Sequence, residues 1–139
     1  MKNRPKLLDV MTADPTTVHL GRPISDVYVM LQEMPFHHVP VVDGNVPVGM
    51  ISATDILKLV YDIEGHDEQM LRKFLDYQFT LEDAMSTDLI AVGTDESVRA
   101  VVDHLATGEA HSVLVTDPRG ELAGIVTSTD LIQLLREML

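Results

Sequence analysis

The chain has 139 residues, of which 45% are apolar and 23% charged, a composition typical of a folded domain. Its formal net charge of −12 argues against duplex nucleic acid as a partner, and the lack of Cys excludes disulfides, thiolate metal ligands and Cys nucleophiles. We expect a cytoplasmic protein, because no signal-peptide pattern and no apolar run of membrane-spanning length is present.

The first half of the chain alternates extended and helical patterns. Ile24, Val27 and Leu31 recur at helical spacing, and Pro23 suits a first helical turn. β-Branched residues on both sides of a turn at Asp43 are typical of a hairpin. The predicted order is a helical turn at 7–11, an extended segment ending at 18, a helix after Pro23, hairpin strands at 38–42 and 46–51, and a helix from Asp55 to about Ile63.

A connecting helix is predicted at 65–77, where Met70, Leu71, Phe74 and Leu75 form an apolar edge. The first order then recurs. The second series is a helical turn at 81–85, an extended segment ending at 92, a helix ending near Gly108, strands at 112–116 and 121–126, and a helix from Asp130 to about Met138.

The recurrence is an internal repeat. With an offset of 74 positions, eleven identities align in order, although unrelated residues coincide only about one time in fifteen. They are Leu7, Asp9, Met11, Asp14, Val18, Val27, Leu31, His37, Val39, Val41 and Asp43 with their partners 74 residues later. The offset becomes 75 after the longer second turn, where Gly49, Thr54, Asp55 and Leu59 align with Gly124, Thr129, Asp130 and Leu134.

We therefore predict an α/β fold made of two β-α-β-β-α repeats related by a pseudo-twofold axis. The first repeat covers 7–63, a helical linker covers 64–79, and the second repeat covers 80–139. Each half has about sixty residues and a small sheet with one uncovered face, so the halves are expected to pack sheet against sheet into one module.

The doubled motif with most information is Gly49-Met50-Ile51-Ser52-Ala53-Thr54-Asp55, repeated as Gly124 to Asp130. A hydroxyl residue followed three positions later by an acid fits a helix capping box. The same arrangement places a carboxylate and free N–H groups at a helix start, where an anionic ligand is favoured. Capping and ligand binding are compatible, so the motif leaves both roles open.

With the upstream Met-Thr or Met-Ser element and the His-x-Val-x-Val strand, the chain from about Leu7 onward resembles a pair of cystathionine-β-synthase-type (CBS) domains. The resemblance implies a cleft between the repeats with up to two sites for AMP, ADP, ATP or S-adenosylmethionine. Mg²⁺ is expected only together with ATP, and family members of this minimal kind form homodimers.

The resemblance also implies individual roles. Asp55 and Asp130 would accept bonds from the ribose hydroxyls, and Ser52, Thr54, Thr127 and Thr129 would face the phosphates. The adenine would be held by Thr16, Thr17, Val18, Ile90, Ala91 and Val92. The cleft would be lined by Val39, Pro40, Val113 and Leu114, with His37 and His111 as further candidates for phosphate contact.

Three classes of function follow. The first is a regulatory module that senses an adenosyl ligand and acts on a separate protein. The second is a ligand-free dimerisation or interaction module. The third, an enzyme, is disfavoured because the sequence shows no nucleophile–base pair, metal-ligand cluster or phosphate-binding Gly-rich loop. Few basic residues accompany the motifs. Arg22, Arg99 and Arg119 are candidates for phosphate neutralisation, although a solvated surface position is favoured for each.

Overall fold

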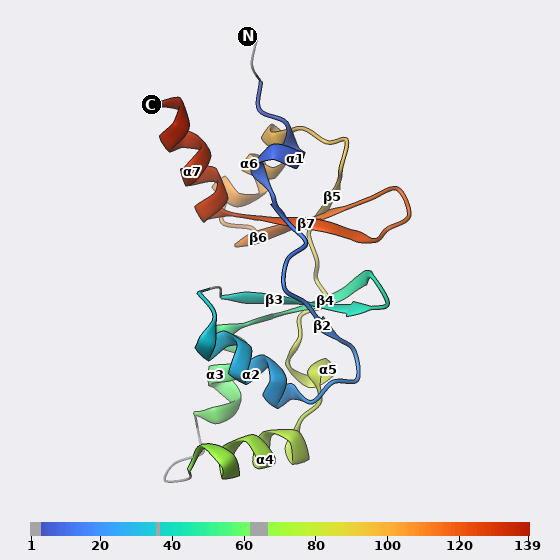
Figure 1. The fold of residues 1–139 in the computed structure, drawn as a ribbon, viewed down its shortest axis with the longest axis vertical. Coiled ribbons are helices and arrows are strands. Elements are labelled where there is room, and N and C mark those ends of the chain that lie inside the picture. Colours follow the sequence, from blue (N-terminus) through green and yellow to red (C-terminus); the bar gives the residue numbers. More distant parts are fainter. Residues whose placement is uncertain (1–3, 36, 62–66) are drawn as a thin grey trace. The chain divides into compact units, whose positions relative to one another are not determined.

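A computed structural model describes residues 4–35, 37–61 and 67–139 and divides the chain into two compact units (Figure 1). The three-stranded unit is Thr16–Asp88, with sheet order β2-β3-β4. The four-stranded unit combines Met1–Pro15 with Leu89–Leu139, and its sheet order is β1-β7-β6-β5. The predicted α/β class is confirmed, because each unit combines a sheet with helices.

The three-stranded unit has a parallel β2–β3 pair joined through a helix, and an antiparallel β3–β4 hairpin. In Figure 1 its helices lie on one side of the sheet. Its elements are β2 (Val18–His19), α2 (Ile24–Glu33), β3 (His38–Asp43), β4 (Val46–Ser52), α3 (Ala53–Val60), α4 (Glu68–Gln78) and α5 (Leu81–Ala84).

The four-stranded unit repeats that arrangement, with β5 parallel to β6 and β6 antiparallel to β7. A short fourth strand, β1, pairs antiparallel with β7. Its elements are α1 (Leu7–Val10), β1 (Thr12–Ala13), β5 (Ala91–Gly93), α6 (Val98–Ala106), β6 (Ser112–Thr116), β7 (Leu122–Thr127) and α7 (Ser128–Met138).

Two predicted helix starts are corrected by the structure. The helices expected from Asp55 and Asp130 begin two residues earlier, at Ala53 and Ser128. Ser52 and Thr127 are the N-caps, so each aspartate is the third residue of its helix and not the first. The predicted helix end near Ile63 and the predicted linker start at 64–66 lie outside the described residues.

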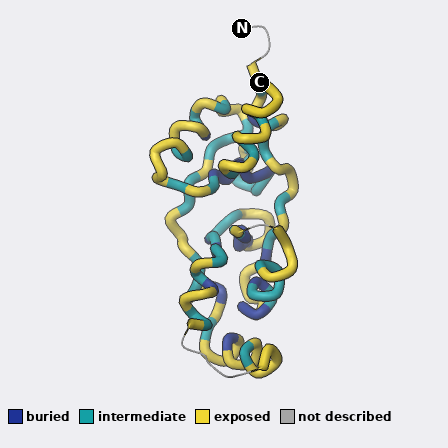
Figure 2. The backbone as a smooth tube through the Cα atoms, turned by 90° about the vertical axis from the view of Figure 1, so that its left-hand side faces the viewer, coloured by how far each residue is buried: buried dark blue, intermediate teal, exposed yellow. Residues whose placement is uncertain are grey.

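The core of each unit lies between its sheet and its helices. Val18, Ile24, Val39 and Ile51 belong to the core of the three-stranded unit, and Val101, Val113, Val115 and Val126 to that of the four-stranded unit. Figure 2 shows the buried residues in the interior of each unit and exposed residues along the outer turns of the chain. Alternate strand residues are thus fixed by packing.

The first segment of each sequence repeat packs in the unit that holds most of the other repeat. We call 7–14 and 81–88 the leading arms. Leu7 of the first arm joins the core of the four-stranded unit, and Leu81 of the second arm joins that of the three-stranded unit. Backbone bonds hold the second arm as well, because Met50 and Ser86 exchange N–H···O bonds of 2.9 and 2.8 Å. The compact units and the sequence repeats therefore divide the chain differently.

The motif glycines make room for the arms. A Cβ atom at Gly49 would lie 2.4 Å from the Met85 sulfur, and one at Gly124 would lie 2.5 Å from the Met11 sulfur. At Gly124 the backbone oxygen of Thr12 would also be only 2.8 Å away. Glycine recurs in the motif because an arm crosses the strand there at close range.

Candidate functional site

In the three-stranded unit, the motif occupies the end of β4 and the start of α3. The backbone N–H of Ser52 donates to Oδ2 of Asp55 at 2.8 Å, and the N–H of Asp55 donates to Oγ of Ser52 at 3.2 Å. These reciprocal bonds form the predicted capping box, which is confirmed. Thr54 is exposed beside the half-buried Asp55. A carboxylate, a hydroxyl and the first backbone N–H groups of α3 therefore meet at one helix start.

The four-stranded unit carries the same capping box between β7 and α7. The N–H and the hydroxyl of Thr127 donate to Oδ2 of Asp130 at 2.9 and 3.3 Å. The arm adds a bond of 3.0 Å from the Thr12 hydroxyl to Oδ1 of Asp130, which has no counterpart among the described residues of the other unit. Thr129, like Thr54, is exposed.

Strand direction brings the predicted adenine segments to the same end of each sheet as the motif. β2 is parallel to β3 and β4 is antiparallel, so the residues before Val18 and the residues from Ser52 onward lie at the end where β3 begins. β5, β6 and β7 repeat this geometry, and Ile90 lies at the corresponding end. Each unit therefore gathers one copy of the predicted adenine segment and one copy of the predicted ribose and phosphate residues.

The other residues predicted to line the cleft or contact phosphate lie in β3 and β6 or directly before these strands. Val39 and Val113 are fully buried in the cores between sheet and helices. His37 and His111 are exposed, and the carbonyl of His37 accepts a bond of 2.9 Å from the N–H of Ala53 at the start of α3. Pro40 and Leu114 are buried at equivalent positions in β3 and β6.

Of the candidate basic residues, Arg22 pairs with Asp26 on α2 at 3.0 Å and is largely exposed. Arg99 lines a groove with residues of α1 and α6, and no residue of the 124–130 motif lines that groove. Within the described residues, no group of three or more His, Asp or Glu side chains is placed to hold a metal ion. No helix among the same residues is long and apolar enough to cross a membrane.

Thr12 is the residue near the site that the sequence did not single out. A hydroxyl recurs at this place in both repeats, as Thr12 and Ser86, 74 positions apart, which is the one signal that was available. The contact itself joins residues 118 positions apart, so a local sequence pattern cannot predict it.

Comparison with known proteins shows to which of them the chain is similar. A family model described as the CBS domain matches residues 7–62 and 81–137. Among solved structures, the CBS domain pair of protein MJ0100, in complex with 5′-methylthioadenosine and S-adenosyl-L-methionine, is 25% identical with a TM-score of 0.78. The match covers 99% of this chain and 100% of that one.

Two curated relatives from Methanocaldococcus jannaschii are longer proteins. One, an L-aspartate semialdehyde sulfurtransferase, is 27% identical over 127 residues, and the other, an uncharacterized protein MJ1225, is 22% identical over 126 residues. The matches cover 91% and 90% of this chain but only 22% and 45% of the respective relatives.

Proposed function

This chain belongs to the CBS domain family, and on that premise we propose that it is a regulatory module that binds an adenosyl ligand and is not an enzyme. One observation carries the proposal. In both units, a capping-box aspartate at a helix start lies at the same sheet end as the segment proposed to hold the adenine.

The proposed contacts follow from the chemistry of these groups. A carboxylate can accept both hydroxyls of a ribose, in charge-assisted bonds that a deoxyribose cannot fully replace. Asp55 uses Oδ2 for the cap, so the cap and the ribose contact do not compete for the same oxygen. The exposed Thr54 and Thr129, with the N–H groups of α3 and α7, would face the phosphates, with Ser52 and Thr127 beside them.

The first candidate ligands are AMP and ADP. Because the chain carries 22 acidic residues against 10 Lys and Arg, extra phosphate charge finds little compensation. Metal-free ATP should therefore bind no better than AMP, and Mg²⁺ should improve ATP binding by offsetting its charge. S-Adenosylmethionine is a second candidate, because the MJ0100 domain pair is complexed with it.

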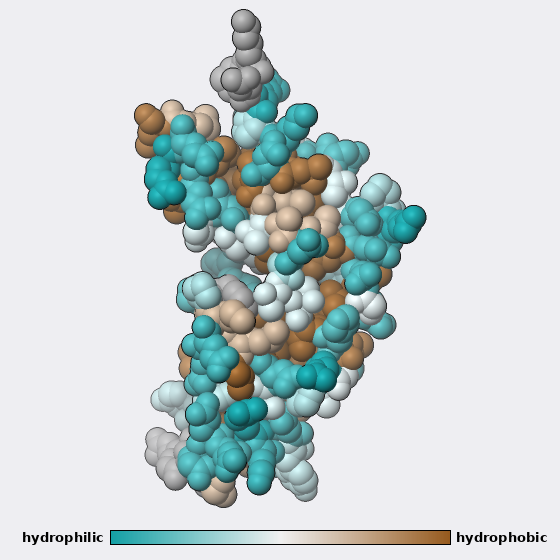
Figure 3. All heavy atoms as spheres, viewed as in Figure 1, coloured by the Kyte–Doolittle hydropathy of each residue, from teal (hydrophilic) through white to brown (hydrophobic). Residues whose placement is uncertain are grey.

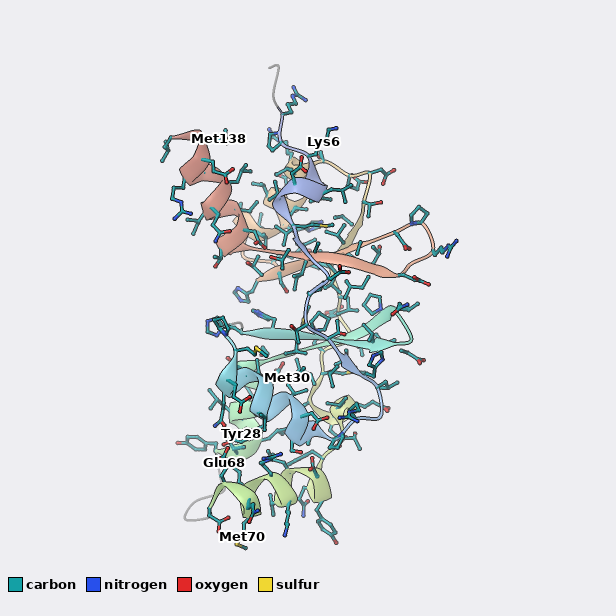
Figure 4. The ribbon with its side chains drawn as sticks, in the orientation of Figure 1. Lys6, Tyr28, Met30, Glu68, Met70 and Met138 are labelled. Carbon is teal, nitrogen blue, oxygen red and sulfur yellow. The ribbon has the colours of Figure 1, made fainter. Side chains whose placement is uncertain are left out.

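The regulatory role requires a partner. We propose that the ligand state is passed to a separate protein, and that the chain forms a homodimer. Exposed apolar side chains support the last point: Leu57 on α3 and Leu135 and Met138 on α7 are more than half exposed. Figure 3 shows apolar atoms at the tip of α7, and Figure 4 places Met138 there. The alternative is a ligand-free interaction module, and the cytoplasmic location stays a prediction from sequence.

Replacing both site aspartates tests the proposal. In the D55N/D130N double variant each side chain keeps an acceptor oxygen for the cap but loses the charge that would accept two hydroxyls. AMP affinity, measured by calorimetry, should fall roughly tenfold or more, since hydrogen bonds to charged groups contribute about 1.5–3 kcal/mol.

D83N is the matched control, because Asp83 completes a third capping box with Thr80 outside the proposed site. It should lose about 1 kcal/mol of stability or less and leave AMP binding unchanged. If the double variant binds AMP like the wild type while its melting temperature falls, the aspartates are only caps. If no adenosyl ligand binds the wild type, the interaction module becomes the better reading.

A further inference from the structure

The two copies of the motif differ in how many bonds their carboxylates already accept. Asp130 accepts three, two from Thr127 and one from Thr12, and both of its oxygens are used. Among the described residues, Asp55 accepts one, from Ser52, and only at Oδ2. Because an ionised carboxylate has about four acceptor positions, a ribose meets more available capacity at Asp55 than at Asp130.

The proposed adenine segments also differ in whether a backbone carbonyl already accepts a hydrogen bond. In the four-stranded unit, the N–H of Leu114 donates to the Ile90 carbonyl at 2.9 Å. The residue equivalent to Leu114 in the three-stranded unit is Pro40, which has no N–H. No donor from the described part of the chain reaches the Thr16 carbonyl, which is the equivalent of the Ile90 carbonyl.

The strand boundaries agree with this difference. β5 begins at Ala91, which pairs with Leu114, whereas β2 begins one equivalent position later, at Val18, which pairs with Val41. Pro40 therefore ends the parallel ladder early and leaves the Thr16 carbonyl to accept a bond from a ligand. An amino group, such as the one on carbon 6 of adenine, is the donor that such an acceptor selects.

We infer that the three-stranded unit holds the stronger adenosyl site, and that Thr12 weakens the other site by occupying Asp130. The inference rests on the proposed function and adds selectivity to it. The stronger site discriminates for a 6-amino purine through Thr16 and for a ribose through Asp55. The weaker site shares its carboxylate with Thr12 and its carbonyl with Leu114, so it discriminates less on both counts.

Single aspartate variants separate the sites. D130N keeps the motif of the three-stranded unit, and D55N keeps that of the four-stranded unit. With AMP as the probe in calorimetry, D130N should bind close to the tighter wild-type affinity and D55N roughly tenfold or more weakly. D130N should also show the larger preference for AMP over 2′-deoxy-AMP and over IMP, which has an oxygen in place of the 6-amino group.

Thr12 is then tested in both backgrounds. In D55N, T12V removes the competing hydroxyl and should strengthen AMP binding roughly three- to tenfold, with a similar gain in preference over 2′-deoxy-AMP. T12S keeps the hydroxyl and should behave like Thr12. In D130N, T12V should change neither quantity, and S86A should be silent in both backgrounds, because the Ser86 hydroxyl accepts a bond from the N–H of Asp88.

The outcomes are distinguishable. Equal AMP affinities of D55N and D130N, or a tighter D55N, would overturn the inference while leaving the proposed function intact. An unchanged ribose preference of D55N after T12V would overturn the role of Thr12, because a merely structural effect would alter the melting temperature and not the discrimination. Failure of AMP and of 5′-methylthioadenosine to bind the wild type would overturn the proposed function and the inference together.

Discussion

The three-stranded and four-stranded units have the same capping box, yet their aspartates have different neighbours. In the four-stranded unit a threonine of the first leading arm bonds the carboxylate, and in the three-stranded unit the equivalent serine bonds its own arm. The strand that pairs with the proposed adenine segment carries Leu114 in β6 and Pro40 in β3. The N–H of Leu114 pairs the Ile90 carbonyl, and Pro40 has no N–H to pair the equivalent carbonyl of Thr16. Two copies of one motif can therefore offer a ligand unequal acceptors.

The leading arms give the largest expected effect. Leu7 and Leu81 are 3% and 2% exposed, each in the core of the unit that holds most of the other repeat. L7A and L81A should each lower the free energy of unfolding in urea by roughly 2–5 kcal/mol, as large-to-small core substitutions do. L8A, at a neighbouring residue of the first arm that is 53% exposed, is the control and should have little effect.

Hydrogen exchange can locate these two effects. L7A should speed amide exchange in β6 and β7, and L81A should speed it in β3 and β4. The reverse assignment, with each substitution loosening the strands of its own sequence repeat, would contradict the exchange of arms.

The two motif glycines, Gly49 and Gly124, should differ in how much stability an alanine substitution costs. In G49A the new methyl group meets only the flexible side chain of Met85, whereas in G124A it also meets the backbone oxygen of Thr12. Backbone cannot move aside as a methionine can, so G124A should cost roughly 1–3 kcal/mol and G49A less. Urea unfolding of both variants measures the difference, and M85A should rescue G49A. Equal costs would show that the two arms cross their strands in the same way.

The smallest predicted effect concerns helix starts. Ser97 is the N-cap of α6, and its side chain accepts a bond of 3.2 Å from the N–H of Ala100. The N-cap of α2 is Pro23, which has no capping side chain, and Asp76 of α4 bonds the N–H and hydroxyl of Ser25 at 2.8 and 2.6 Å. D76A should cost about 1–2 kcal/mol and S97A about 1 kcal/mol or less. Both costs are measured by urea unfolding. If S97A lowers the free energy of unfolding more than D76A does, the connecting helix α4 does not stabilise α2.

Local sequence determined much of this molecule. The capping boxes join residues three positions apart, the amphipathic helices follow a 3.6-residue period, and the hairpins follow from β-branched runs around a turn at Gly44, where φ is +64°. Because these interactions join residues that are close in sequence, the repeat, the order of its elements and both capping-box aspartates could be predicted.

Only the tertiary structure decided which unit each arm joins and what bonds each aspartate. Thr12 and Asp130 are 118 positions apart, and Ser25 and Asp76 are 51 apart, so no periodic pattern records either contact. Pro40 was visible in the sequence, but its effect depends on the parallel pairing of β2 with β3, which places a carbonyl opposite the missing N–H. The sequence fixes which donors and acceptors exist, whereas long-range packing determines which of them meet.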